Sequence, residues 1–140
     1  MLFVGVDWAE DHHDVCVMAE DGLVLSKRRV PDSVAGIGDL HGLVAEHADD
    51  DEAVVVGIEI DRGLVVWSLL EAGFEVYAIN PMASARYRDR HATSGAKSDP
   101  GDAKVLADLV RTDRHNHRPI AGDSDLAEGV KVLARAHQSA

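Results

Sequence analysis

Short apolar runs alternate along this chain with longer stretches in which apolar residues recur every three or four positions. The first pattern is typical of buried β-strands and the second of amphipathic helices. Strands are predicted at residues 2–7, 14–19, 23–30, 53–60 and 74–80. Helices are predicted at residues 32–48, 63–73, 81–91 and from 99 onward. This order predicts an α/β fold whose mixed sheet joins an antiparallel meander to right-handed βαβ crossovers.

The segment beyond the last of these helices has a different pattern. After a polar loop around Pro119, apolar residues recur at Leu126, Val130 and Leu133, which is the spacing of a heptad repeat. We therefore predict two units, a domain at residues 1–118 and the start of a helical or coiled-coil segment at residues 119–140.

Carboxylates stand at the ends of two predicted strands and at the start of one helix. Asp7 ends the first strand, and Glu59 ends the strand that this topology places beside it. Functional sites in such sheets form beyond the carboxyl ends of the strands, where the strand order reverses. Asp99 and Asp102 are three residues apart and share one helix face. If that helix crosses the same sheet edge, these four residues form one cluster, which we call the acidic tetrad.

Four ionised carboxylates at close range repel one another, and divalent cations remove that conflict. Oxygen ligands suit a hard cation such as Mg²⁺, and a pair of such ions can clamp both oxygens of a phosphoryl displacement. A simpler interpretation also fits the helix start. Asp99 can cap the helix, with Pro100 at its first position and Asp102 in its first turn. Asp61, two residues past the strand-ending glutamate, is an alternative ligand.

The charge of the chain changes sign along its length. The net charge is −11, which by itself argues against nucleic acid as a partner. Residues 1–80 hold 17 acidic and 4 basic side chains, whereas residues 81–118 hold 5 acidic and 8 basic ones. The basic excess surrounds the aspartate pair, which allows phosphate contacts there. The candidates for contacts with nucleic-acid phosphates are Arg86, Arg88, Arg90 and Lys97. A solvent-exposed helix face is the competing interpretation of these residues.

Cysteine usage and apolar run lengths indicate a cytoplasmic, soluble protein. Cys16 is the only cysteine, so no internal disulfide can form and a reducing compartment is expected. The first residues lack the basic start of a secretory signal. No apolar stretch approaches the roughly 20 residues that span a bilayer, so we expect no membrane partner.

Four motifs together resemble a known family. The segments GVDWAEDHHDV, GIEIDRG, VYAINP and KSDPGDAKVLADLV are similar to the N-terminal domain of DEDD transposases of the insertion-sequence 110 type, relatives of the Piv DNA invertases. The terminal VKVLARAHQ resembles the start of the helical segment that follows this domain. The resemblance implies a RuvC-like, ribonuclease H-like sheet flanked by helices with a C-terminal helical extension. It also implies that the acidic tetrad is the family's catalytic, metal-binding set.

The resemblance implies DNA strand cleavage and exchange during transposition, dependent on Mg²⁺ with Mn²⁺ as a substitute. In some members an element-encoded RNA guides the reaction. The sequence departs from the family pattern at two places. Ile60-Asp61-Arg62-Gly63 follows the glutamate, where the family usually has a small hydroxyl residue and then glycine, and Ser98 replaces threonine. Family members continue into a second domain that carries a serine nucleophile. Because this sequence ends at Ala140, we expect a fragment that cannot complete transposition alone.

Two other functions compete with the transposase interpretation. A non-catalytic nucleic-acid-binding or dimerisation module would pair chains through the terminal heptad. We then expect a homodimer or higher oligomer. Light scattering should show a monomer when residues 120–140 are removed. An actin-like or sugar-kinase ATPase shares the β-β-β-α start, but it needs glycine-rich phosphate loops, and Glu20-Asp21-Gly22 is too short and acidic for one. Nucleotide protection in a thermal shift would favour the ATPase.

Overall fold

The computed structural model describes residues 1–91 and 99–120 of the chain. Its sheet has six strands in the spatial order β3-β2-β1-β4-β5-β6. The strands are β1 (Leu2–Trp8), β2 (His12–Met18), β3 (Val24–Pro31), β4 (Val54–Ile58), β5 (Glu75–Ala78) and β6 (Arg118–Pro119). The α-helices are α1 (Val34–His47), α2 (Leu64–Glu71), α3 (Pro81–His91) and α4 (Asp99–Asp113).

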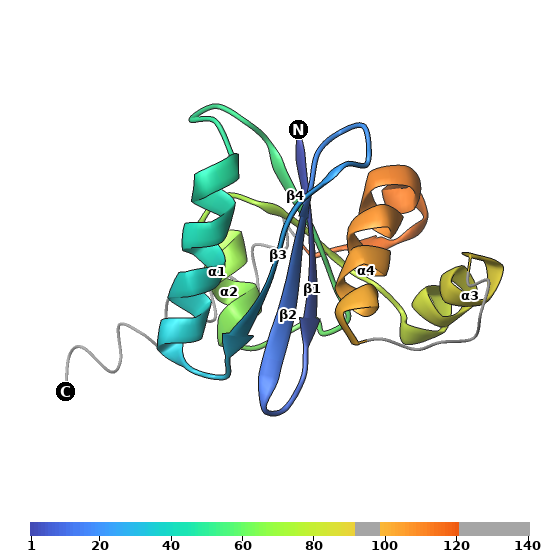
Figure 1. The fold of residues 1–140 in the computed structure, drawn as a ribbon, viewed down its shortest axis with the longest axis horizontal. Helices are drawn as coiled ribbons and strands as arrows, with labels where there is room; N and C mark the ends of the chain where they lie inside the picture. Colours follow the sequence, from blue (N-terminus) through green and yellow to red (C-terminus); the bar gives the residue numbers. More distant parts are fainter. Residues whose placement is uncertain (92–98, 121–140) are drawn as a thin grey trace.

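Strand directions change at the centre of this sheet. β1 pairs antiparallel with β2 and parallel with β4, so the meander and the crossover half meet along β1. Helices α1 and α2 cover one face of the sheet and α4 covers the other, with α3 beyond α4 (Figure 1). Side chains of the central strands are buried on both faces, as expected of parallel strands between two helical layers.

Two glycines in register allow α4 to lie unusually close to the sheet. Gly5 on β1 pairs with Gly57 on β4, and both face α4. A Cβ atom at Gly5 would lie 1.9 Å from the Ala103 carbonyl oxygen, and one at Gly57 would lie 2.7 Å from the Leu106 carbonyl oxygen. Only glycine fits against a helix backbone at this distance. These two positions therefore set where α4 crosses the sheet.

The direction of α4 follows from contacts at its two ends. Near its C-terminal end, the guanidinium of Arg114 lies 5.4 Å from the ring centre of Phe3, at the start of β1. Ala103, in the second turn of α4, packs on Gly5 in the middle of β1. The helix therefore runs antiparallel to β1, and its first turn lies toward the strand's carboxyl end, where Asp7 stands.

The mixed α/β sheet predicted from the sequence is confirmed, with the meander, both crossovers and the helix beginning at Asp99. The structure adds β6, and Ile120 just beyond it is 6% exposed and donates its backbone N–H to the Val76 carbonyl at 2.7 Å. The predicted C-terminal helical segment lies outside the described residues from position 121, so the 118/119 boundary stays a prediction. Within the described part of the chain, no helix is long and apolar enough to cross a membrane.

Candidate metal centre

Two acids predicted for the site lie on neighbouring strands at the same sheet edge. Asp7 and Glu59 each directly follow the register pair Val6↔Ile58. Because side chains alternate along a strand, both lie on the face of Gly5 and Gly57, which is the face that α4 covers. Both are half-buried. The switch point of the sheet therefore carries two carboxylates side by side, as the sequence predicts.

The other two predicted acids lie in the first turn of α4. Asp102 is half-buried and directly precedes Ala103, the residue that packs on Gly5. Asp99 is the first residue of the helix, and its side chain lies outside the described part of the structure. The backbone of α4 thus brings this turn to the edge that carries Asp7, while membership of all four acids in one centre stays a prediction.

Two side chains of helix α3 donate hydrogen bonds to two of these acids, which was not predicted from the sequence. The Ser84 hydroxyl donates to Oε2 of Glu59 at 3.0 Å, and Nη1 of Arg88 donates to Oδ1 of Asp102 at 2.6 Å. Ser84 is 4% exposed. The two α3 residues are four apart and so share one helix face. That spacing, within the segment between the two acidic motifs, was the signal available in the sequence.

Among the side chains that the structure describes, which do not include that of Asp99, no three histidine, cysteine or acidic residues are grouped closely enough to hold a metal ion. One contact above works against a metal-binding group, because the Arg88 guanidinium is paired with Asp102. The donor chemistry still suits a hard divalent cation, since every acid offers carboxylate oxygens.

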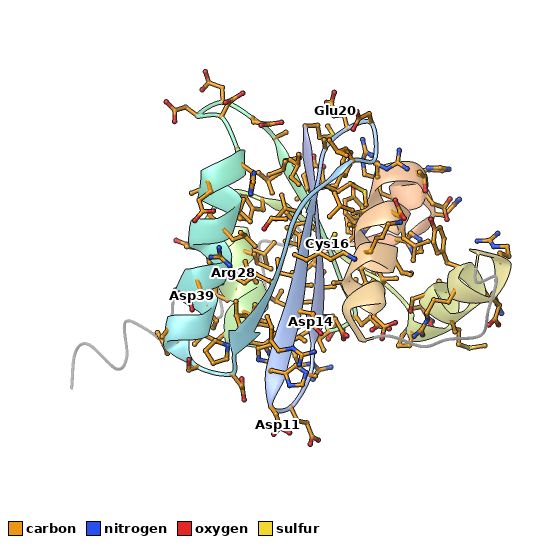
Figure 2. The ribbon with its side chains drawn as sticks, viewed as in Figure 1. Asp11, Asp14, Cys16, Glu20, Arg28 and Asp39 are labelled. Atoms are coloured by element: carbon orange, nitrogen blue, oxygen red, sulfur yellow. The ribbon has the colours of Figure 1, made fainter. Side chains whose placement is uncertain are left out.

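A further carboxylate missed from sequence lies beside Asp7. Asp14 on β2 is directly opposite Asp7 and is 7% exposed, and Figure 2 shows it on the α4 side of the sheet. Arg29 on β3 neutralises it through a hydrogen bond of 3.0 Å from Nε to Oδ1. The row across β4, β1, β2 and β3 is therefore Glu59, Asp7, Asp14, Arg29. In the hairpin of β1 and β2, residues at equal distances from the turn are opposite one another, which pairs position 7 with position 14. The sequence could therefore have predicted that Asp14 lies beside Asp7.

Asp61, the alternative ligand, is engaged in ion pairs in the structure. Its Oδ2 accepts from Arg118 at 2.8 Å and its Oδ1 from Arg62 at 3.2 Å. These hydrogen bonds, the one from Arg118 foremost, lower the pKa of the Asp61 carboxyl. The carboxylate thereby ties the loop after β4 to β6.

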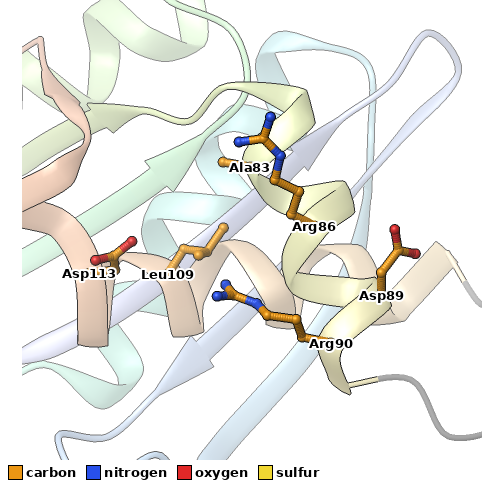
Figure 3. Close-up of a pocket in the computed structure, with 6 residues that line it drawn as sticks. All are labelled: Ala83, Arg86, Asp89, Arg90, Leu109 and Asp113. Carbon is orange, nitrogen blue, oxygen red and sulfur yellow. The ribbon is translucent and has the colours of Figure 1, made fainter.

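The predicted nucleic-acid-binding cations divide into three groups. Arg86 and Arg90 are exposed, and within the described residues neither forms an ion pair. They line a groove of about 470 Å³ together with Leu109 and Asp113 of α4, and Figure 3 shows both arginines on α3, with Arg90 extending toward Leu109. Arg88 contacts the acidic tetrad. Lys97 lies outside the described residues.

A buried ion pair network anchors α3 to α4 behind the candidate site. Asp108 is 5% exposed and accepts hydrogen bonds from the Tyr87 hydroxyl and from Nζ of Lys104, each at 3.0 Å. Burial and the hydrogen bond to Asp108 raise the pKa of Tyr87 to about 12, so the phenol remains a donor. This network keeps the α3 residues that contact the tetrad in register with α4.

The sheet order and flanking helices define a RuvC-like, ribonuclease H-like domain. The fold matches the Thermus thermophilus RuvC structure with a TM-score of 0.56 and 23% identity, over 85% of this chain and 99% of that one. It also matches T. thermophilus RuvC in complex with Holliday junction substrate, with a TM-score of 0.52 and 22% identity over the same shares. At these identities the likeness shows the fold alone.

Sequence comparison gives the family. The model of the DEDD transposases of the insertion-sequence 110 type, described as transposase, matches residues 4–140, and the chain belongs to this family. It is 52% identical over 140 residues to the mini-circle putative transposase for IS117 of Streptomyces coelicolor, covering 99% of this chain and 34% of that protein. It is 36% identical over 121 residues to putative transposase y4uE of Sinorhizobium fredii, covering 85% and 34%. The chain spans about a third of these curated relatives.

Proposed function

We propose that this chain is the metal-binding part of a transposase that cleaves and exchanges DNA strands. The observation that carries the proposal is the meeting of Asp7 and Glu59 on adjacent strands, under the first turn of α4. Membership of the transposase family and the RuvC-like fold support DNA as the partner. A solved RuvC on the same fold is in complex with a Holliday junction substrate, which agrees with a DNA partner.

In this proposal the acidic tetrad holds two Mg²⁺ ions, for which Mn²⁺ can substitute. The ions supply Lewis-acid activation of the attacking and leaving oxygens when they are bound. The residues of the chain then have separate tasks. The carboxylates fix the ions at the sheet edge, and Ser84 orients Glu59 through its hydroxyl. Such hydrogen bonds from neighbouring residues commonly set the geometry and affinity of a metal ligand.

Arg86 and Arg90 contact the phosphate backbone of the nucleic acid in this proposal. They are four residues apart on α3, so their guanidinium groups can follow one strand along the groove beside α4. Guanidinium contacts to phosphate position a duplex without reading its sequence. The same groove could take an element-encoded guide RNA, because RNA presents the same phosphate chemistry.

Titration calorimetry with Mn²⁺ tests the metal centre. We expect Glu59→Gln to weaken Mn²⁺ binding at least about tenfold, because it removes one charged ligand while keeping an acceptor for Ser84. Glu71→Gln is the matched control, since it removes an equal charge from an exposed residue at the end of α2. Asp102→Ala is expected to behave as Glu59→Gln does. Equal affinity in Glu59→Gln and Glu71→Gln would refute the metal centre.

A further inference from the structure

Arg88 and Ser84 hold acids of the proposed metal centre in chemically different ways. The serine hydroxyl is neutral and can also donate to the Pro81 carbonyl at 3.0 Å, so it leaves the charge of Glu59 uncompensated. Arg88 is a permanent cation whose Nη1 lies 2.6 Å from Oδ1 of Asp102. A charge-assisted hydrogen bond of this length is among the stronger ones in proteins. Arg88 therefore occupies the carboxylate that the metal would need.

The surroundings of this ion pair allow it to open. The Arg88 side chain is 38% exposed and that of Asp102 is 29% exposed, so the guanidinium can reach solvent without uncovering the core. Arg86 and Arg90 line the groove beside α4, on a different side of α3 from Arg88, which is two residues from each. A guanidinium that leaves Asp102 stays beside the proposed metal centre, and its planar fork matches a phosphate group there.

We propose that Arg88 acts as an exchangeable counter-ion for Asp102, occupying it while metal is absent and moving to a nucleic-acid phosphate when metal binds. This inference rests on the proposed function, because it assigns a regulatory contact to the same metal centre. A divalent cation at Asp102 repels the neighbouring guanidinium, and a phosphate drawn to the metal attracts it. Metal and DNA binding therefore favour one another, with Arg88 as the positioning residue that couples them.

Mn²⁺ titration of the wild type and three variants tests the exchange. Arg88→Gln removes the competing cation and is expected to bind Mn²⁺ at least about fivefold more tightly than wild type. Arg28→Gln is the matched control, because it removes the same charge from an exposed residue of β3 that belongs to neither proposed site and forms no ion pair among the described residues. Its affinity is expected to change less than about twofold. Arg88→Lys retains a cation but loses the fork, and is expected to fall between wild type and Arg88→Gln.

A second readout measures the coupling itself. The affinity of a fluorescein-labelled DNA duplex is measured by anisotropy with and without Mn²⁺, at constant ionic strength. The ratio of the DNA affinity with Mn²⁺ to that without Mn²⁺ is expected to fall at least about threefold in Arg88→Gln and to be retained in Arg28→Gln. Thermal unfolding of each variant verifies that it is folded. If Arg88→Gln does not fold, Arg88→Lys provides the same test.

The outcomes separate this inference from the proposed function. Mn²⁺ binding by the wild type, with no tighter binding in Arg88→Gln than in Arg28→Gln, overturns the inference alone. Equal coupling ratios in the two variants overturn it as well. A wild-type protein that binds no Mn²⁺ refutes the metal centre, and the exchange falls with it.

Discussion

Replacement of Gly5 by alanine is expected to force α4 away from the sheet. The new Cβ atom would lie 1.9 Å from the carbonyl oxygen of Ala103, whereas ordinary contact begins at 3.4 Å, so the helix must move by about 1.5 Å. The obstructing atom belongs to a helix backbone, which cannot rotate aside as a side chain can. Overpacking of this kind costs about 1–3 kcal/mol, and we expect Gly5→Ala to reach about 3 kcal/mol.

Alanine at two other glycines is expected to change stability by different amounts, according to the space around each added Cβ atom. At Gly57 the nearest backbone oxygen would lie 2.7 Å from the added Cβ, which requires a shift of about 0.7 Å, and about 1–2 kcal/mol is expected. Gly42 on α1 has no atom within 4 Å of such a Cβ. Alanine there is expected to stabilise the helix by about 0.5–1 kcal/mol, because glycine is the more costly residue in a helix interior.

Urea denaturation followed by circular dichroism measures the unfolding free energy of all three variants, and thermal denaturation measures their melting temperatures. The expected order of stability is Gly42→Ala, wild type, Gly57→Ala and Gly5→Ala, with a melting temperature about 10 °C below wild type for the last. Because the same shift carries the first turn of α4 away from Asp7, Mn²⁺ affinity is expected to fall in Gly5→Ala and not in Gly42→Ala. A Gly5→Ala protein as stable as wild type would refute the close contact between α4 and β1.

Two further predictions concern charge. Arg86→Gln is expected to lower DNA affinity similarly for unrelated duplex sequences and to reduce the slope of log affinity against log salt by about 1, measured by anisotropy; an unchanged slope would exclude a phosphate contact. Burial lowers the pKa of His41, whose Nε2 lies 2.9 Å from the Ser68 hydroxyl oxygen. Its contribution to stability is complete above pH about 6.5 and is lost as the pH falls through the folded pKa. His41→Gln should therefore lose less unfolding free energy than wild type between pH 7.5 and 5.5 in urea titrations, and an equal loss would contradict the assignment.

Strand and helix periodicities in the sequence were sufficient for the fold class. The apolar runs at β1 and β4 predict buried strands, and the structure confirms both, side by side in the middle of the sheet. β6 was missed because Arg118 and Pro119 form two exposed residues without alternation, too short for any periodic signal. What holds them is distant in sequence, namely the hydrogen bond from Ile120 to Val76 on β5.

The candidate site divides in the same way. Asp7 and Glu59 could be predicted together because the carboxyl ends of adjacent parallel strands meet at one edge, which is a rule of topology. The spacing of Ser84 and Arg88 indicated only a shared helix face, because their contacts with the acids depend on the packing of α3 beside α4. Asp61 looked equally eligible from its position, and only the approach of Arg118 showed it to be engaged elsewhere.

The sequence by itself determined the order of elements, the central strands and the location of the acids at strand and helix ends, because these depend on local periodicity and short-range rules. The tertiary structure alone decided how closely α4 approaches the sheet, and which basic or hydroxyl group each acid contacts. Those features depend on contacts between residues far apart in the chain, such as Gly5 with Ala103 and Arg88 with Asp102. Such contacts leave no periodic trace in the sequence, since each is set by the packing of whole elements.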